Sequence, residues 1–158
     1  MLKILGCALI IGAFGSGGMV AAAYFRRQVA VLESFLRVVS SIGARIGFCL
    51  TPLEKIFSEL DDRQLAGFLE EARQIGAGKA FENCREQQYL SDSEKNLLGT
   101  FFRELGTHSA GEEKTNCDYV ADRLSAALES RRAELPKKMK LSRSLCFLTG
   151  IMITIMLY

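Results

Sequence analysis

Uncharged apolar segments occupy both ends of this 158-residue chain. Residues 4–25 include no charged side chain, and a helix of that length spans about 33 Å, enough for a hydrocarbon core of about 30 Å. Residues 145–158 are also uncharged and give about 21 Å, or about 27 Å from Leu141 if Arg143 extends to the membrane interface. We therefore predict two transmembrane helices, over 1–25 and 141–158.

Cations border both apolar segments on the side that faces the middle of the chain. These residues, which we assign to a basic collar at the membrane interface, are Arg26, Arg27, Lys137, Lys138, Lys140 and Arg143. Because loops rich in Lys and Arg stay in the cytoplasm, the pattern predicts a cytoplasmic domain over 26–140. Two alternatives stay open, namely a cleaved signal peptide ending near Ala21–Ala23 and a buried core helix at the C-terminus.

The middle of the chain carries apolar residues at helical spacing, and no stretch alternates as a strand would. The first apolar stripe consists of Leu32, Phe35, Val39, Ile42 and Ile46. Recurrence every three or four residues predicts an amphipathic helix that continues the first membrane segment. Thr51 and Glu54 then have the spacing of a capping box, with Pro52 at the first helical position. A second helix is expected from there to about Leu60.

Caps and glycines divide the following stretch into two further helices. Asp61–Asp62 is predicted to cap a third helix, and Gly76 and Gly78 are predicted to end it. A short fourth helix is expected over about 79–88.

Two more capping patterns precede the last helices of the middle segment. Ser91 and Glu94 form a predicted capping box at the start of a fifth helix, which Gly106 stops. The Ser109–Glu112 stretch repeats the pattern before a sixth helix that reaches Leu135. The predicted fold is all-α, an antiparallel bundle of about six helices over 26–140 with one transmembrane helix on either side.

Charge and cysteine content exclude several classes of protein. The net charge of +2 is too close to neutral to indicate a nucleic-acid partner. All eighteen acids lie between Glu33 and Glu134, so the two ends are basic and apolar. The five cysteines have neither zinc-site nor disulfide-framework spacing, which fits a reducing compartment and small residues of a core or membrane helix.

Candidate catalytic chemistry is sparse. His108 is the one histidine, and a lone histidine in a turn is expected to be an exposed turn residue. The paired acids, such as Glu70–Glu71 and Glu112–Glu113, lie at helix starts or on solvated faces. The glycines of GAFGSGG lack the Lys-Ser/Thr of a phosphate loop. We therefore expect no catalytic residue, no metal site and no cofactor.

Four stretches carry a family resemblance when they are taken in order. They are MLKILG (1–6), VLESFLRVVSSIGARIGFCLTPLEKI (31–56), LSDSEKNLLGTFFRELG (90–106) and KLSRSLCFLTGIMITIML (140–157). Together they resemble the stage III sporulation protein AB family of endospore-forming bacteria. The chain departs from the family at Phe81 or Cys84, where a tryptophan is common. It departs again after Gly106, where Ser109 and Glu112 or Glu113 replace an Asp and then a Gln.

The resemblance implies a fold and a process. The fold would be related to the cytoplasmic domain of type II secretion F and type IV pilus platform proteins. The chain would lie in the mother-cell membrane around the forespore, as a multi-pass protein with its bundle in the cytoplasm. It would couple a cytoplasmic secretion-type ATPase to a sporulation-specific, secretion-like channel.

The implied partners are that ATPase, other membrane proteins of the stage III complex and the lipid bilayer, while a homo-oligomer is left open. Docking to the ATPase would rely on charges of helices three and five, and the candidates are Glu70, Glu71, Arg73, Lys95 and Arg103. Two rival hypotheses are a platform subunit of a true type II secretion or type IV pilus system and a small membrane enzyme. Platform subunits of those systems generally carry two such bundles, whereas this chain has length for one.

Overall fold

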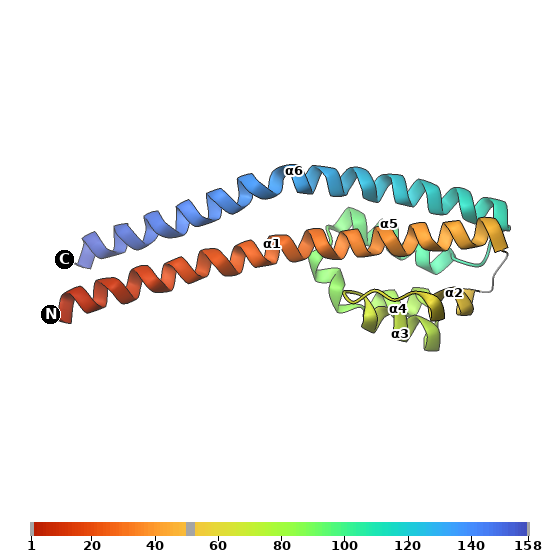
Figure 1. Ribbon diagram of the computed structural model, residues 1–158, viewed down its shortest axis with the longest axis horizontal. Coiled ribbons are helices and arrows are strands. Elements are labelled where there is room, and N and C mark those ends of the chain that lie inside the picture. Colours follow the sequence, from red (N-terminus) through yellow and green to blue (C-terminus); the bar gives the residue numbers. More distant parts are fainter. Residues whose placement is uncertain (1, 50–52, 158) are drawn as a thin grey trace. The chain divides into compact units, whose positions relative to one another are not determined.

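The computed structural model describes the backbone of residues 2–49 and 53–157 (Figure 1). Over these residues the protein is all-helical, with six α-helices, one 3₁₀ helix and no strand. The description leaves out the side chains of 2–19, 47–49 and 154–157, and those of Glu54, Arg143, Cys146, Phe147 and Gly150. The predicted Thr51–Glu54 capping box therefore lies outside the described residues.

The helices follow the predicted order. They are α1 (Leu2–Cys49), α2 (Leu53–Glu59), α3 (Ala66–Ile75), α4 (Ala77–Asn83), the 3₁₀ helix η1 (Arg85–Tyr89), α5 (Asp92–Glu104) and α6 (Ala110–Leu157). The prediction that the first bundle helix continues the N-terminal segment is confirmed, because α1 is one helix of 48 residues. Helix α6 is equally long and continues through Pro136.

The chain divides into two compact units. Unit 2 is Gln28–Glu129, and unit 1 combines Met1–Arg27 with Ser130–Tyr158. Unit 1 thus contains both predicted membrane segments and the basic collar. The predicted cytoplasmic domain ends at residue 140, whereas unit 2 ends at Glu129.

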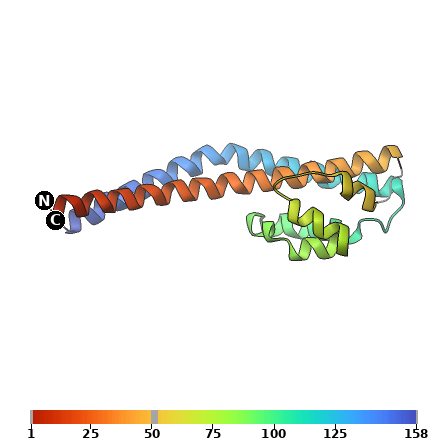
Figure 2. The same cartoon turned by 60° about the horizontal axis from the view of Figure 1, so that its bottom comes forward.

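A cluster of four phenylalanines forms the centre of unit 2. Its members are Phe35 of α1, Phe68 of α3, Phe81 of α4 and Phe102 of α5, all of them buried. Every pair of these rings lies within 5.0–6.4 Å, centroid to centroid. Each ring comes from a different helix, so burial of this one cluster fixes α3, α4 and α5 against α1. The second view shows α2 to α5 together along one side of residues 28–49 (Figure 2).

Two glycines allow helices of unit 2 to approach closely. A Cβ atom on Gly43 of α1 would lie 2.8 Å from the Cβ of Cys117 in α6. A Cβ atom on Gly78 of α4 would lie 3.2 Å from the Cα of Arg103 in α5. The prediction that Gly78 ends the third helix is therefore wrong, since Gly78 lies inside α4 and brings its backbone close to α5. Gly76, with φ of 88°, does end α3.

The prediction that Asp61–Asp62 caps the third helix is also wrong. Helix α3 begins at Ala66, and Leu65 precedes it without a side-chain cap. The reason is that Asp62 is buried and its carboxylate is already engaged. Its Oδ2 accepts a 2.8 Å hydrogen bond from Arg37 of α1, and its Oδ1 accepts one of 2.9 Å from the Gln64 N–H. The predicted fourth helix, 79–88, is divided into α4 and η1.

The predicted Ser91–Glu94 capping box is present at the start of α5. Ser91 Oγ accepts from the Glu94 N–H, and the Glu94 carboxylate accepts from the Ser91 N–H at 2.7 Å. At the start of α6 only half of the pattern forms. Glu112 Oε2 accepts from both the N–H and the hydroxyl of Ser109, at 3.1 and 2.8 Å. Gly106, with φ of 90°, follows the end of α5 as predicted.

Candidate interaction surfaces

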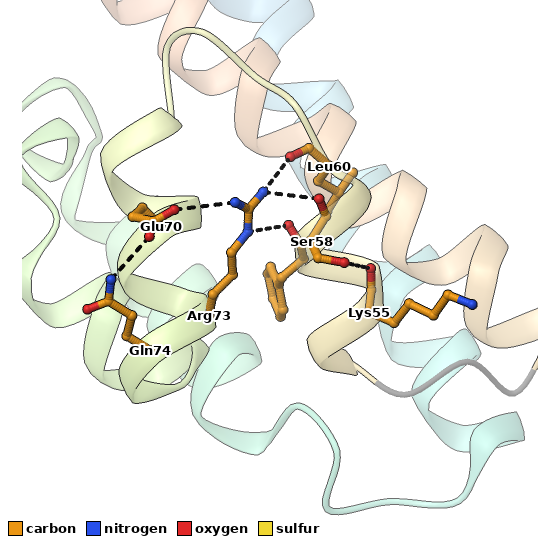
Figure 3. A network of polar contacts seen from close by, with 7 residues as sticks. Lys55, Ser58, Leu60, Glu70, Arg73 and Gln74 are labelled. Atoms are coloured by element: carbon orange, nitrogen blue, oxygen red, sulfur yellow. Dashed lines mark hydrogen bonds and ion pairs between the residues drawn. The ribbon is translucent and has the colours of Figure 1, made fainter.

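An arginine of α3 ties that helix to the end of α2 (Figure 3). Arg73 Nε donates to the carbonyl of Phe57 at 2.9 Å, and one terminal nitrogen donates to the carbonyls of Ser58 and Leu60 at 3.2 and 3.3 Å. These carbonyls belong to the last residues of α2 and the residue after it, where no further helical N–H is available. Arg73 therefore supplies the cap that the short helix α2 lacks in its own sequence.

Glu70 completes this network from the same helix. Its Oε2 accepts from Arg73 at 3.3 Å, and its Oε1 accepts from Gln74 at 3.1 Å (Figure 3). The sequence marked Glu70 and Arg73 as exposed charges for a partner. The structure gives Arg73 a second role, with Glu70 holding its guanidinium, that the sequence did not indicate, because the carbonyls that Arg73 contacts are 13 or more residues away in the chain.

A second ion pair fixes the loop before α3. Arg37 donates to the buried Asp62, while the same guanidinium also donates to Ser34 at 3.0 Å. Burial raises the pKa of Asp62, but the hydrogen bonds from Arg37, Gln64 N–H and Ser34 outweigh burial and hold it below its usual value. The carboxylate therefore stays charged at neutral pH and keeps the turn at residues 62–65 in place.

The turn between α5 and α6 contains the one histidine and a buried glutamate. Glu113 Oε1 accepts from the N–H of Gly106 at 2.6 Å and from that of His108 at 3.3 Å. His108 itself is exposed, as predicted, and its Nδ1 lies 3.1 Å from the hydroxyl of Thr107. The sequence did not indicate this role of Glu113, although an acid in the first turn of a helix after a glycine turn is a usable signal.

The two described internal cysteines are core residues, as predicted. Cys84 and Cys117 are both buried and free. Burial raises the pKa of each thiol to about 12, and the nearby Glu86 and Glu113 carboxylates add to the effect. The thiolate is the nucleophile and the metal ligand, so both sulfurs are unreactive at neutral pH. Among the described residues, no cluster of three or more His, Cys, Asp or Glu is placed to bind a metal ion.

A groove of about 530 Å³ opens at the junction of α2, α3, α4 and α5. Apolar side chains line it, among them Phe57, Phe102 and Leu105, and Ile75 at its edge is about half exposed. Its charged lining residues are Lys79, Glu82 and Arg103, and Arg103 lies 3.7 Å from Glu82. An apolar floor with a charged rim is the usual composition of a protein–protein contact surface.

The structure does not bring the five predicted partner residues to one place. Arg103 lines the groove, and Glu70 pairs with Arg73 at the end of α2. Glu71 lines a separate, smaller hollow beside Cys84, and Lys95 pairs with Asp92 in the first turn of α5 at 3.3 Å. Of the five candidates, only Arg103 lines the groove.

The collar residues that the structure describes are exposed. Arg26 and Arg27 lie on α1, and Lys137, Lys138 and Lys140 lie on α6. Among the described residues, no helix contains a stretch that is long and apolar enough to cross a bilayer. Most side chains of 1–25 and half of those of 141–158 are outside the described set.

Comparison with known families identifies the chain. The family model of stage III sporulation protein AB matches residues 3–158. The chain therefore belongs to the stage III sporulation protein AB family. No curated protein and no solved structure matched it.

Proposed function

We propose that this protein is a non-catalytic platform subunit of a sporulation-specific channel between mother cell and forespore. Residues 1–25 and 141–158 anchor it in the mother-cell membrane around the forespore. Residues between them form a cytoplasmic domain that couples a secretion-type ATPase to the membrane assembly. Membership of the stage III sporulation protein AB family, over residues 3–158, is the observation that carries the proposal.

The distribution of charge between the two units supports the membrane anchor. Unit 1 contains nine Lys or Arg and one acid, a net charge of +8, whereas unit 2 contains eleven Lys or Arg and seventeen acids, a net charge of −6. The cations of unit 1 other than Lys3 lie within 26–27 and 131–143, beside the apolar segments. Cations at that position favour the cytoplasmic surface of a membrane, where anionic lipids lie.

The groove at the junction of α2 to α5 supports a docking role for unit 2. Apolar side chains line the groove together with Arg103, whose side chain is largely exposed although it lies 3.7 Å from Glu82. An exposed pair of this kind contributes little to folding stability. Its charges are therefore available to steer and orient a charged partner such as the ATPase.

Complementation of a strain that lacks the gene tests the proposal. We expect Arg103→Glu to block spore formation while protein level and membrane location stay normal. The double change Glu82→Arg with Arg103→Glu restores the pair in reverse, and we expect it to remain defective because the partner still meets the wrong charge. The matched control is Lys114→Glu, an exposed cation of α6 outside the groove, which should complement fully.

Two outcomes would contradict the proposal. Normal spores from Arg103→Glu would remove the groove as the docking site. Full complementation by a fragment limited to residues 28–129 would remove the membrane-anchored platform itself. His108→Ala should complement, because the proposal assigns no chemical step to the histidine. A sporulation defect from that change, at normal protein level, would favour the small-enzyme hypothesis instead.

The alternative function is a platform subunit of a type II secretion or type IV pilus system. The fold relationship that the family resemblance implies is the reason to keep this alternative. Genes for a secretion pseudopilin beside this one, with sporulation intact in a deletion strain, would support that alternative.

A further inference from the structure

One face of α6 in unit 1 carries lysines at one end and exposed apolar side chains along the rest. The apolar members are Leu141, Leu145, Leu148 and Met152, with exposed fractions of 67%, 62%, 61% and 72%. At about 100° per residue, these four and the two lysines Lys137 and Lys138 fall within an arc of roughly 100°. We call this surface, from Lys137 to Met152, the α6 face.

The lengths along the α6 face match one leaflet of a bilayer. Lys138 and Met152 are separated by about 21 Å of helix. The acyl region of one leaflet is about 15 Å deep, half of a hydrocarbon core of about 30 Å. The lysines at the Lys137 end of the α6 face would therefore lie at the depth of the lipid headgroups when the apolar residues contact the acyl chains.

The positive charge at the Lys137 end of the α6 face favours an anionic binding partner. Glu134 is the one acid in the sequence of unit 1, and its carboxylate pairs with Lys138 at 2.7 Å. Lys137, Lys138 and Lys140 are all exposed. A single carboxylate cannot balance this cluster, which leaves a net positive surface beside the apolar one.

A second copy of the chain fits the α6 face poorly, because of the charge on its own lysines. A parallel pair across the α6 face would place Lys137 and Lys138 of both copies against each other, with one Glu134 each already engaged by Lys138. An antiparallel pair would place the lysines of one copy beside Met152 of the other, at the depth of the hydrocarbon, where charges are costly. Lipid phosphate over acyl chains avoids both problems.

We propose that the α6 face binds anionic phospholipid, with the headgroup phosphate at Lys137 and Lys138 and the acyl chain along Leu141, Leu145, Leu148 and Met152. This inference rests on the proposed membrane anchor. It adds a lipid preference that a membrane anchor alone does not require, since a purely apolar helix has no preference between anionic and zwitterionic lipids.

The absence of tryptophan from the chain permits a clean fluorescence test. The full-length chain with Leu145→Trp is reconstituted into phosphatidylcholine vesicles that contain some phosphatidylglycerol. Either the anionic or the zwitterionic lipid carries bromine on its acyl chains and quenches the reporter on contact. We expect stronger quenching per brominated molecule from phosphatidylglycerol, and a preference that declines as salt is raised.

Substitution of the lysines measures how much their charge contributes to the preference for phosphatidylglycerol. A lysine near an anionic membrane surface is worth about 1 kcal/mol, or about fivefold in relative affinity. The variant with Lys137→Gln and Lys138→Gln should therefore lower the preference for phosphatidylglycerol by roughly fivefold per lysine. The matched control, Lys55→Gln with Lys114→Gln, removes two exposed lysines of unit 2 and should leave the preference unchanged.

The outcomes separate this inference from the proposed anchor. Equal quenching by both brominated lipids leaves the anchor in place and overturns the lipid preference. No quenching by either lipid overturns both, since the reporter is then outside the bilayer. Weak quenching, together with energy transfer between copies of the chain that carry different fluorescent labels, would show that a second copy covers the α6 face. That outcome would also overturn the lipid proposal.

Discussion

The two units of this protein treat apolar side chains in opposite ways. Unit 2 buries its own, and every member of the main core cluster lies between Val31 and Leu128. Of the eight large apolar side chains that are exposed in the described part of the chain, six lie in unit 1. The charge differs in the same manner, at −6 for unit 2 and +8 for unit 1.

The difference shows that helix content alone does not say what stabilises a segment. Helices α1 and α6 contribute residues to both units, yet the same helices bury apolar residues in unit 2 and expose them in unit 1. Unit 2 has a hydrophobic core of its own. Unit 1 exposes six large apolar side chains, and exposed apolar surface of this kind is typical of sites that contact a partner or a membrane.

The largest expected effect contrasts one core residue with one exposed residue. We expect Phe102→Ala to lower the free energy of unfolding by about 3–5 kcal/mol, because it removes a ring that contacts four others and leaves a cavity. Leu148→Ala in unit 1 should change it by less than about 0.5 kcal/mol. Urea unfolding of the full-length chain in detergent, followed by circular dichroism, measures both. Equal losses from the two changes would mean that the units share one core.

The next effect compares two ion pairs, one with a buried carboxylate and one in which both side chains are exposed. Asp62→Asn should cost about 1.5–3 kcal/mol at neutral pH, because the buried carboxylate accepts hydrogen bonds from the charged guanidinium of Arg37, although the Arg37 side chain is itself largely exposed. The folded pKa of Asp62 is lowered, so this stabilisation is present above the unfolded pKa of about 3.9 and is lost as pH falls through the folded pKa. The difference between wild type and variant should therefore narrow at pH values below about 4.

The matched control for Asp62 is the exposed pair of unit 1. Lys138 also lowers the pKa of Glu134, but both side chains are about half exposed, and exposed pairs contribute little. Glu134→Gln should leave the unfolding midpoint unchanged. A constant difference between wild type and Asp62→Asn across the acid range would show that the charge of Asp62 is not what stabilises the turn.

The smallest effect compares two glycines of unit 2. Gly43→Ala should destabilise by about 1–3 kcal/mol, because its Cβ atom would overlap Cys117 where α1 meets α6. Gly67→Ala in α3 meets no atom within 4 Å and should stabilise by up to about 1 kcal/mol through helix propensity. Thermal unfolding of the two variants gives the sign directly. Stabilisation by Gly43→Ala would mean that the two helices separate at this point at little cost.

Part of the fold follows from local pattern. Apolar spacing of three and four placed the helices, and the caps at Ser91 and Gly106 set the limits of α5 correctly, because a cap depends on residues within four positions of itself. The family was also readable from the sequence, since it rests on the order of short motifs along the chain. The relationship to secretion platform domains stays a prediction.

The roles of several polar residues and glycines could be assigned only from the tertiary structure, and the reason is the same for each. Asp62 was expected to cap α3 but pairs with Arg37, 25 residues earlier. Gly78 was expected to end a helix but lets α4 lie against α5. Arg73, a candidate partner residue, also caps α2, which its sequence position did not indicate. In each case the contact that decides the role comes from a residue distant in the sequence. Local pattern thus determined where helices form and which segments are apolar, while tertiary packing decided which polar side chains and glycines hold those helices together.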